Sequence, residues 1–123
     1  MKFTLDTGSS PNLIRSYSPG SIRVAEQLIQ RSCVISAQTL ITDWEPQTLD
    51  ELQPAHLGAI FALQPELVVL GTGPQHRFAP VVIRAAFNTR GVGLESMDLG
   101  AACRTFNVLV QEERRVVAAL FLR

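Results

Sequence analysis

The chain has 123 residues, 46% of them hydrophobic, and its 11 basic and 11 acidic residues give a formal net charge of zero. This length predicts one domain over residues 1–123, which can bury enough apolar surface to fold without a disulfide or a metal. A neutral chain lacks the excess of positive charge with which general nucleic-acid binders and anionic-membrane binders attract their targets. We therefore expect neither nucleic acid nor a membrane as a partner.

The first third of the chain has the composition and alternation of β structure. Residues 1–11 end in Gly-Ser-Ser-Pro and are expected to form a loosely ordered tail. Pro19-Gly20 is a turn dipeptide, which predicts a hairpin between the segments before and after it. In the second segment, one face is expected to carry Ile22, Val24 and Leu28. The expected strands are residues 12–18, 21–30, 32–37 and 39–44.

Beyond Pro46 the pattern changes to alternating helices and strands. Thr48 and Glu51 have the spacing of a capping box, which predicts a short turn at residues 49–52. Pro54 can occupy the first turn of a helix. The later elements are expected to be a helix at 54–63, a buried parallel strand at Leu67–Leu70, a helix at 80–88 closed by Gly91, a strand at 92–96, a helix capped by Asp98 and ending near Gln111, and a strand at 114–122.

This order predicts the fold class. Strands that alternate with helices build layered α/β domains around a mostly parallel sheet. The β-rich first third makes a purely parallel sheet improbable, so a three-layer α/β domain with a mixed sheet and an added N-terminal β layer is expected.

The loop Gly71-Thr72-Gly73 follows the buried strand, as glycine loops that hold phosphates do. The dinucleotide fingerprint needs a third glycine where this chain has His76, and Pro74 lacks a backbone N–H. A Walker loop is absent as well. Two alternatives remain open. The loop is either a turn whose glycines adopt backbone angles that other residues avoid, or a ligand site at the carboxyl end of the strand, to which Thr72 contributes a hydroxyl and His76 and Arg77 contribute donors to an anion.

The helix expected at residues 99–111 has two distinct faces at 100° per residue. Its core face carries Leu99, Ala102, Cys103, Phe106, Leu109 and Val110. Its opposite face carries Gly100, Arg104, Asn107 and Gln111. This polar face is either solvated or a groove in which Arg104 and Asn107 fix a carboxylate or a phosphate. Residues 71–110 carry a net charge of +2, which would favour an anion there.

No arrangement of residues indicates catalysis, a metal or a cofactor. Cys33 and Cys103 lie among apolar neighbours and are expected to be buried free thiols in a reducing compartment. His56 and His76 lack partners at metal-ligand spacing. The N-terminus lacks the features of a signal or transit peptide, so a cytoplasmic location is expected. Packing in the core or at its rim is expected for the aromatic residues Trp44, Phe61, Phe78, Phe87 and Phe106.

The combined pattern "GTG", "GVGLESMD" and "AACRTFNVLVQEERRVVAAL" resembles the family called domain of unknown function 498. The resemblance covers residues 12–122 and is densest from Leu67 to Leu122. It implies a three-layer α/β fold with a central mixed sheet and an added β layer, and no established enzymatic activity. The family has a eukaryotic branch that serves as a mitochondrial assembly factor for respiratory complex I. The residues that match its recurring motifs are Gly71, Thr72, Gly73, Arg104, Thr105 and Asn107.

Two functions are therefore weighed, and whether the chain catalyses a reaction stays open. The first is a non-catalytic, soluble binding or assembly module that holds a protein partner. The second is a site for a small anionic ligand, built by Gly71, Thr72, Gly73 and Arg77 of the loop and by a helix face with Arg104, Thr105 and Asn107.

Overall fold

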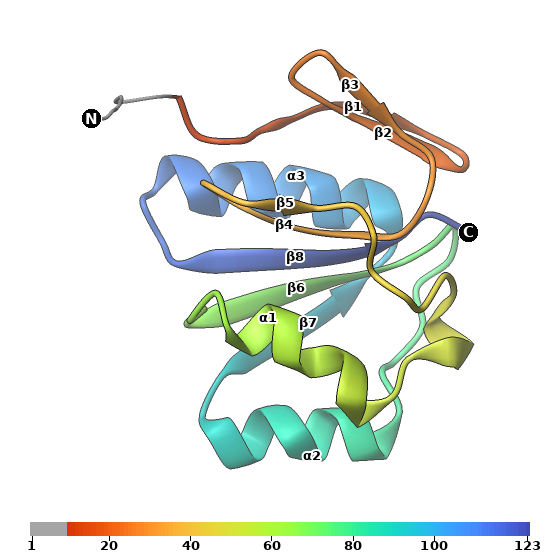
Figure 1. The fold of residues 1–123 in the computed structure, drawn as a ribbon, viewed down its shortest axis with the longest axis vertical. Helices are drawn as coiled ribbons and strands as arrows, with labels where there is room; N and C mark the ends of the chain where they lie inside the picture. The colour runs from red at the N-terminus through yellow and green to blue at the C-terminus, as the bar shows by residue number, and fades with distance from the viewer. Residues whose placement is uncertain (1–9) are drawn as a thin grey trace.

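The computed structural model describes residues 10–123, which form two β-sheets and three α-helices (Figure 1). The smaller sheet has the strand order β1-β2-β3 and the larger one β5-β4-β8-β6-β7. The strands are β1 (Ile14–Ser18), β2 (Ser21–Val24), β3 (Gln27–Ile29), β4 (Cys33–Ser36), β5 (Leu40–Ile41), β6 (Leu67–Thr72), β7 (Gly93–Met97) and β8 (Val116–Phe121). Of the expected N-terminal tail, residues 1–9 lie outside the described part of the chain.

The larger sheet is mixed, as the sequence predicts. Strand β6 pairs in parallel with both β7 and β8, while β4 runs antiparallel to β8 and to β5. Four of its five strands therefore point the same way. Strand β8 lies in the middle, and β6 is also an interior strand with a neighbour on each side.

Helices cover both faces of the larger sheet (Figure 1). Helix α3 (Leu99–Gln111) packs on one face, and the three-stranded sheet covers the outer side of that helix. The other face carries α2 (Val81–Arg90), α1 (Gly58–Phe61) and the two 3-10 turns η1 (Leu49–Glu51) and η2 (Pro54–Leu57). The expected added β layer is thus confirmed, and it encloses α3 between two sheets.

The two long helices begin and end where their sequences predict. The side chain of Asp98 accepts a hydrogen bond of 2.9 Å from the N–H of Ala101, which satisfies a donor of the first turn of α3. Gly91 follows α2 with φ of 68°, a left-handed conformation that glycine adopts without strain. The predicted core face of α3 is confirmed: five of its six residues are buried and Leu109 is partly buried.

The segment 21–30 is not one strand, which corrects the sequence reading. It turns back at Ala25, whose φ is 51°, and forms the separate strands β2 and β3. Because this turn changes the alternation, Leu28 is 48% exposed instead of facing inward with Ile22 and Val24. A non-glycine residue at positive φ is uncommon, and the segment contains no glycine or proline that would predict this turn.

The capping box also lies elsewhere than predicted. Thr48 makes no side-chain cap, and Glu51 accepts a hydrogen bond from the backbone of Gln47 instead. The reciprocal bonds of a capping box join Gln53 and His56, at the start of η2. The helix expected at 54–63 therefore begins as a 3-10 turn and is α-helical only over α1.

Between residues 10 and 123, none of the helices has the length and apolar character that crossing a membrane requires.

Candidate functional site

The two glycines of the loop act in different ways. Gly71 belongs to β6, and a Cβ there would lie 2.9 Å from Leu120 Cδ2 and 3.1 Å from Ala102 Cβ. Gly71 therefore permits the close packing of α3 and β8 around β6. Only Gly73 has the unusual backbone angle that the sequence suggested for both, with φ of 93°.

The polar side chains of the loop are occupied by the protein itself. Thr72 is buried, and its hydroxyl donates to the carbonyl of Gln75 at 2.7 Å and accepts from the N–H of Arg77 at 3.0 Å. The Arg77 guanidinium lies 2.6 Å from Oδ1 of Asp50, which belongs to η1. The hydroxyl of Thr72 thus stabilises the turn, and Arg77 is paired with a carboxylate.

Strand β1 covers part of the polar face of α3, at Gly100 and Asn107, whereas Arg104 and Gln111 remain exposed. Asn107 Oδ1 accepts from the N–H of Ile14 at 2.8 Å, and Asn107 Nδ2 donates to the carbonyl of Ile14 at 2.9 Å. The Tyr17 ring lies so close to Gly100 that a Cβ there would be 2.8 Å away. Arg104 donates to the Tyr17 hydroxyl. The missing side chain at Gly100 leaves room for the Tyr17 ring, and the amide of Asn107 bonds to the backbone of Ile14. Both features hold β1 against α3.

One cavity brings part of the predicted site together. It has a volume of about 420 Å³ and lies among the turn after β6, the start of α3 and the turn between β1 and β2. Gly73 and Arg104 both line it, whereas Gly71, Thr72, Arg77, Thr105 and Asn107 are not among its lining residues. Its walls include the Tyr17 ring, Pro74, Leu99 and Leu122.

The chemistry of this cavity is mixed. The guanidinium of Arg104 can pair with a carboxylate or a phosphate. Asp98 also lines the cavity and carries a negative charge that opposes such an anion. The cavity thus suits a ligand with an apolar body and one anionic group held near Arg104.

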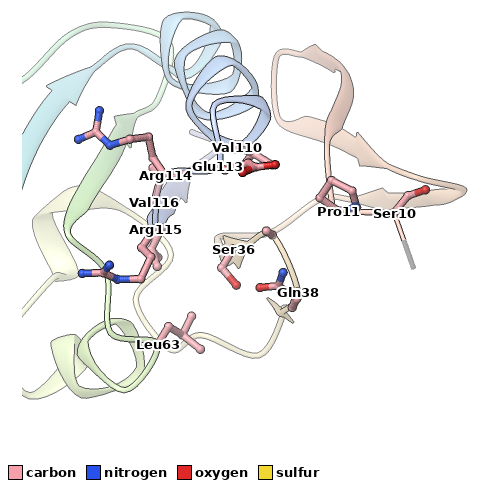
Figure 2. A pocket seen from close by; sticks show the side chains of 12 residues that line it. Ser10, Pro11, Ser36, Gln38, Leu63, Val110, Glu113, Arg114, Arg115 and Val116 are labelled. Carbon is pink, nitrogen blue, oxygen red and sulfur yellow. The ribbon is translucent and has the colours of Figure 1, made fainter. Parts of the chain in front are cut away.

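A second cavity of about 400 Å³ lies at the opposite end of the larger sheet, near the C-terminal end of α3 (Figure 2). Arg114 and Arg115 line it, but Figure 2 shows both guanidinium groups pointing away from it. Glu66 accepts from the Arg115 N–H at 2.9 Å and lies 3.3 Å from Arg114 Nε. These contacts, the Arg115 bond first, lower the pKa of Glu66. The guanidinium of Arg114 is therefore paired with Glu66, while Arg115 Nε donates to the carbonyl of Gln64 at 3.3 Å.

The two cysteines are buried and free, as predicted. Burial raises the pKa of Cys33 to about 12, with a further contribution from the nearby Cys103. Burial also raises the pKa of Cys103 to about 12. Because the thiolate is the nucleophilic form, neither thiol is activated at neutral pH.

The two histidines lie in different surroundings. His56 Nε2 lies 3.2 Å from a carboxylate oxygen of Glu45, and the His76 ring stands edge-on to Phe78. No three His, Cys, Asp or Glu side chains in the described region converge on a point where a metal ion could bind.

The most exposed apolar side chains of the described chain gather before and at the start of α2. Phe78 is 75% exposed, Val81 71% and Val82 56%. We call these three residues the 78–82 patch. The expectation that Phe78 packs in the core or at its rim is wrong, whereas Trp44, Phe87 and Phe106 are buried as predicted.

The helical pattern of α2 accounts for the two valines of the 78–82 patch. On α2 the buried residues are Ile83 and Phe87, one turn apart, and they define the face toward the sheet. At about 100° per residue, Val81 and Val82 point away from that face, and Phe78 precedes the helix.

Three comparisons with known proteins agree with this fold. An NMR structure of a Xanthomonas campestris protein superimposes with a TM-score of 0.87 at 37% identity, over 99% of this chain and 92% of that one. The mouse (Mus musculus) protein "NADH dehydrogenase [ubiquinone] 1 alpha subcomplex assembly factor 3" is 33% identical over 87% of this chain. Its Danio rerio counterpart is 28% identical over 91% of this chain.

The shared region is only part of those assembly factors. The matched region spans 58% of the mouse protein and 65% of the Danio rerio protein. The family model described as "Protein of unknown function (DUF498/DUF598)" matches residues 14–121, which run from the start of β1 to the end of β8. The chain therefore belongs to the DUF498/DUF598 family.

Proposed function

We propose that this chain is a non-catalytic binding module that holds a partner protein. The observation that carries the proposal is the 78–82 patch. Three large apolar side chains that are each more than half exposed lie within five residues of one another. Contiguous exposed apolar surface marks sites of protein interaction more often than scattered residues do.

The relatives support a module of this kind. Two of them are named as assembly factors of NADH dehydrogenase, and a role in assembly is consistent with binding to another protein. The part that they share with this chain is the folded unit from β1 to β8. The chemistry of the thiols points the same way, because the two strongest potential nucleophiles of the chain are buried with raised pKa values.

The proposed module works in the cytoplasm. Cys33 and Cys103 both belong to the core between α3 and the larger sheet, and both are free thiols. Reducing conditions keep such thiols in that form.

The test is affinity capture with a patch variant and a control variant, each of which replaces exposed apolar residues with serine. The tagged chain is used to capture proteins from an extract of its source organism, and the partner is identified by mass spectrometry. The variant Phe78→Ser/Val81→Ser removes the most exposed part of the patch without touching the core. The control Leu28→Ser makes the same kind of change on β3, where Leu28 is 48% exposed.

We expect one partner in a fixed ratio to the wild-type chain, retained by Leu28→Ser and lost by the patch variant. If the patch variant still captures the partner, the interface lies elsewhere on the module. The absence of any partner at a fixed ratio, across growth conditions, would overturn the proposed function.

A second candidate function is binding of a small anionic ligand, favoured by the cavity that Gly73 and Arg104 share. Thermal denaturation with inorganic phosphate and with aliphatic carboxylates of increasing length tests it. We expect a carboxylate with an apolar body to raise the midpoint in wild type and in Tyr17→Phe, which leaves Arg104 in place. The effect should disappear in Arg104→Ala. If none of these compounds raises the midpoint, the chain has no such site.

A further inference from the structure

Strand β7 forms one edge of the larger sheet. It pairs with β6 alone among the strands of the described chain. The N–H of Gly93 donates to the carbonyl of Glu66 at 3.2 Å, on the β6 side. Because successive residues of a strand direct their backbone groups to opposite sides, Leu94 and Ser96 direct their N–H and C=O groups away from β6. An edge with such groups is a template for another strand.

A groove follows this edge. It has a volume of about 420 Å³ and lies between β7 and α2, with Leu94 and Ser96 on one side and Arg84 and Phe87 on the other. Phe78 also lines it, so the groove is continuous with the 78–82 patch. An added strand would therefore meet both unpaired backbone groups and apolar side chains.

The charges along the edge define what fits there. Arg84 is exposed, and its Nε donates to the carbonyl of Ala79 at 3.1 Å. No ion pair within residues 10–123 involves Arg84 or Glu95. Arg84 thus offers a positive charge to the groove, and Glu95, which is also among its lining residues, offers a negative charge at the same edge.

These two charges lie on opposite faces of the sheet. Leu94 is in register with Val68 of the α2-side core, whereas Glu95 is in register with Val69 of the α3-side core. The side chains of an added strand also alternate between faces. Its groove-side positions would hold an apolar and an acidic side chain, and the position between them would hold a basic one opposite Glu95.

A second copy of this chain fits the edge poorly. Two antiparallel β7 strands would bring the two Glu95 carboxylates to the same face, where neighbouring like charges repel. The groove-side residues of β7 are Leu94 and Ser96, which supply no acid for Arg84. The charges therefore favour a different chain.

We propose that β7 accepts an extended segment of a partner protein as a sixth strand of the larger sheet. The segment carries an apolar and an acidic residue two positions apart, with a basic residue between them. This inference rests on the proposed function and names the chemistry of the partner. Main-chain hydrogen bonds to Leu94 and Ser96 provide the binding, and the alternating side chains select the segment.

The test uses synthetic peptides and the full chain labelled with 15N. The probe is an eight-residue peptide with valine and aspartate two positions apart, lysine between them, and threonine elsewhere. The control peptide has the same composition, with lysine and aspartate exchanged. We expect the probe to shift the amide signals of Leu94 and Ser96 and to slow their hydrogen exchange. Shifts confined to other elements, or equal shifts with the control peptide, would overturn the inference.

A charge reversal gives an independent readout. Arg84→Glu should weaken binding of the probe by about fivefold to tenfold, since a like charge replaces an opposite one. The same variant should bind the probe and the control peptide with similar affinity, because each peptide then faces one like charge and one opposite charge. Arg23→Glu, an equal charge change at an exposed position of β2, should leave both affinities unchanged. Equal losses in the two variants would refute the assigned role of Arg84.

The outcomes separate this inference from the proposed function. A partner that is captured through the 78–82 patch while the probe leaves β7 unaffected would refute strand addition and leave the binding module standing. A chain that captures no partner at a fixed ratio refutes both.

Discussion

Replacing Asn107 with alanine tests how the N-terminal hairpin is held on α3. Its side chain makes two hydrogen bonds with Ile14, accepting from the N–H at 2.8 Å and donating to the carbonyl at 2.9 Å. Ile14 is only 5% exposed and begins strand β1. Asn107→Ala leaves both of these backbone groups without the partner that the fold provides.

The expected loss of stability follows from these two bonds. A hydrogen bond contributes about 0.5–1.5 kcal/mol net, and a buried group left unsatisfied costs about 1–3 kcal/mol. Water can reach the partly buried site, so we expect Asn107→Ala to lower the free energy of unfolding by about 2–3 kcal/mol. For a domain of this size that corresponds to a fall in Tm of about 6–12 °C.

Urea unfolding followed by circular dichroism measures this loss, with Val108→Ala as the matched control. Val108 is the next residue of α3 and is 52% exposed, so its variant should change stability by less than about 0.5 kcal/mol. Hydrogen exchange at the Ile14 N–H should also become faster in Asn107→Ala. A loss below about 0.5 kcal/mol, or unchanged exchange at Ile14, would refute the claim that Asn107 docks β1.

Three further outcomes are expected. Gly71→Ala should lower the free energy of unfolding by about 1–3 kcal/mol in chemical denaturation, because its Cβ would lie 2.9 Å from a buried methyl group of Leu120. Glu66 has a lowered pKa when folded, so its contribution is present above the unfolded pKa and is lost as the pH falls through the folded pKa. Glu66→Gln should therefore be less stable than wild type at pH 7 and equal to it in strong acid. Cys33 and Cys103 should react with a thiol reagent only at the rate of unfolding, and prompt labelling of the native chain would contradict their burial.

The regular elements with strong local signals could be predicted from the sequence. The cap of α3 at Asp98 and the αL glycine after α2 are determined by a few neighbouring residues, so their positions can be predicted from the local sequence. The apolar stripe of α3 identifies its core face for the same reason. Alternation of helices and strands after Pro46 then leads to the mixed α/β class, which the structure confirms.

The candidate site depended on contacts that local patterns do not contain. A glycine, an arginine and an amide on one helix face suit a ligand and suit a covering strand equally well. The contacts of this face with the hairpin join residues about ninety positions apart along the chain, so no local pattern contains them. The same limit explains why the exposure of Phe78 was not predicted. Whether an aromatic residue in an apolar run is buried depends on how the neighbouring helix packs on the sheet.

Hydrogen–deuterium exchange of the chain with and without its captured partner tests the central claim most directly. The account predicts slower exchange at the outward amides of β7, Leu94 and Ser96, together with Val81 and Val82 at the start of α2. Protection that appears instead around Gly73 and Arg104, with β7 and α2 unchanged, would contradict it.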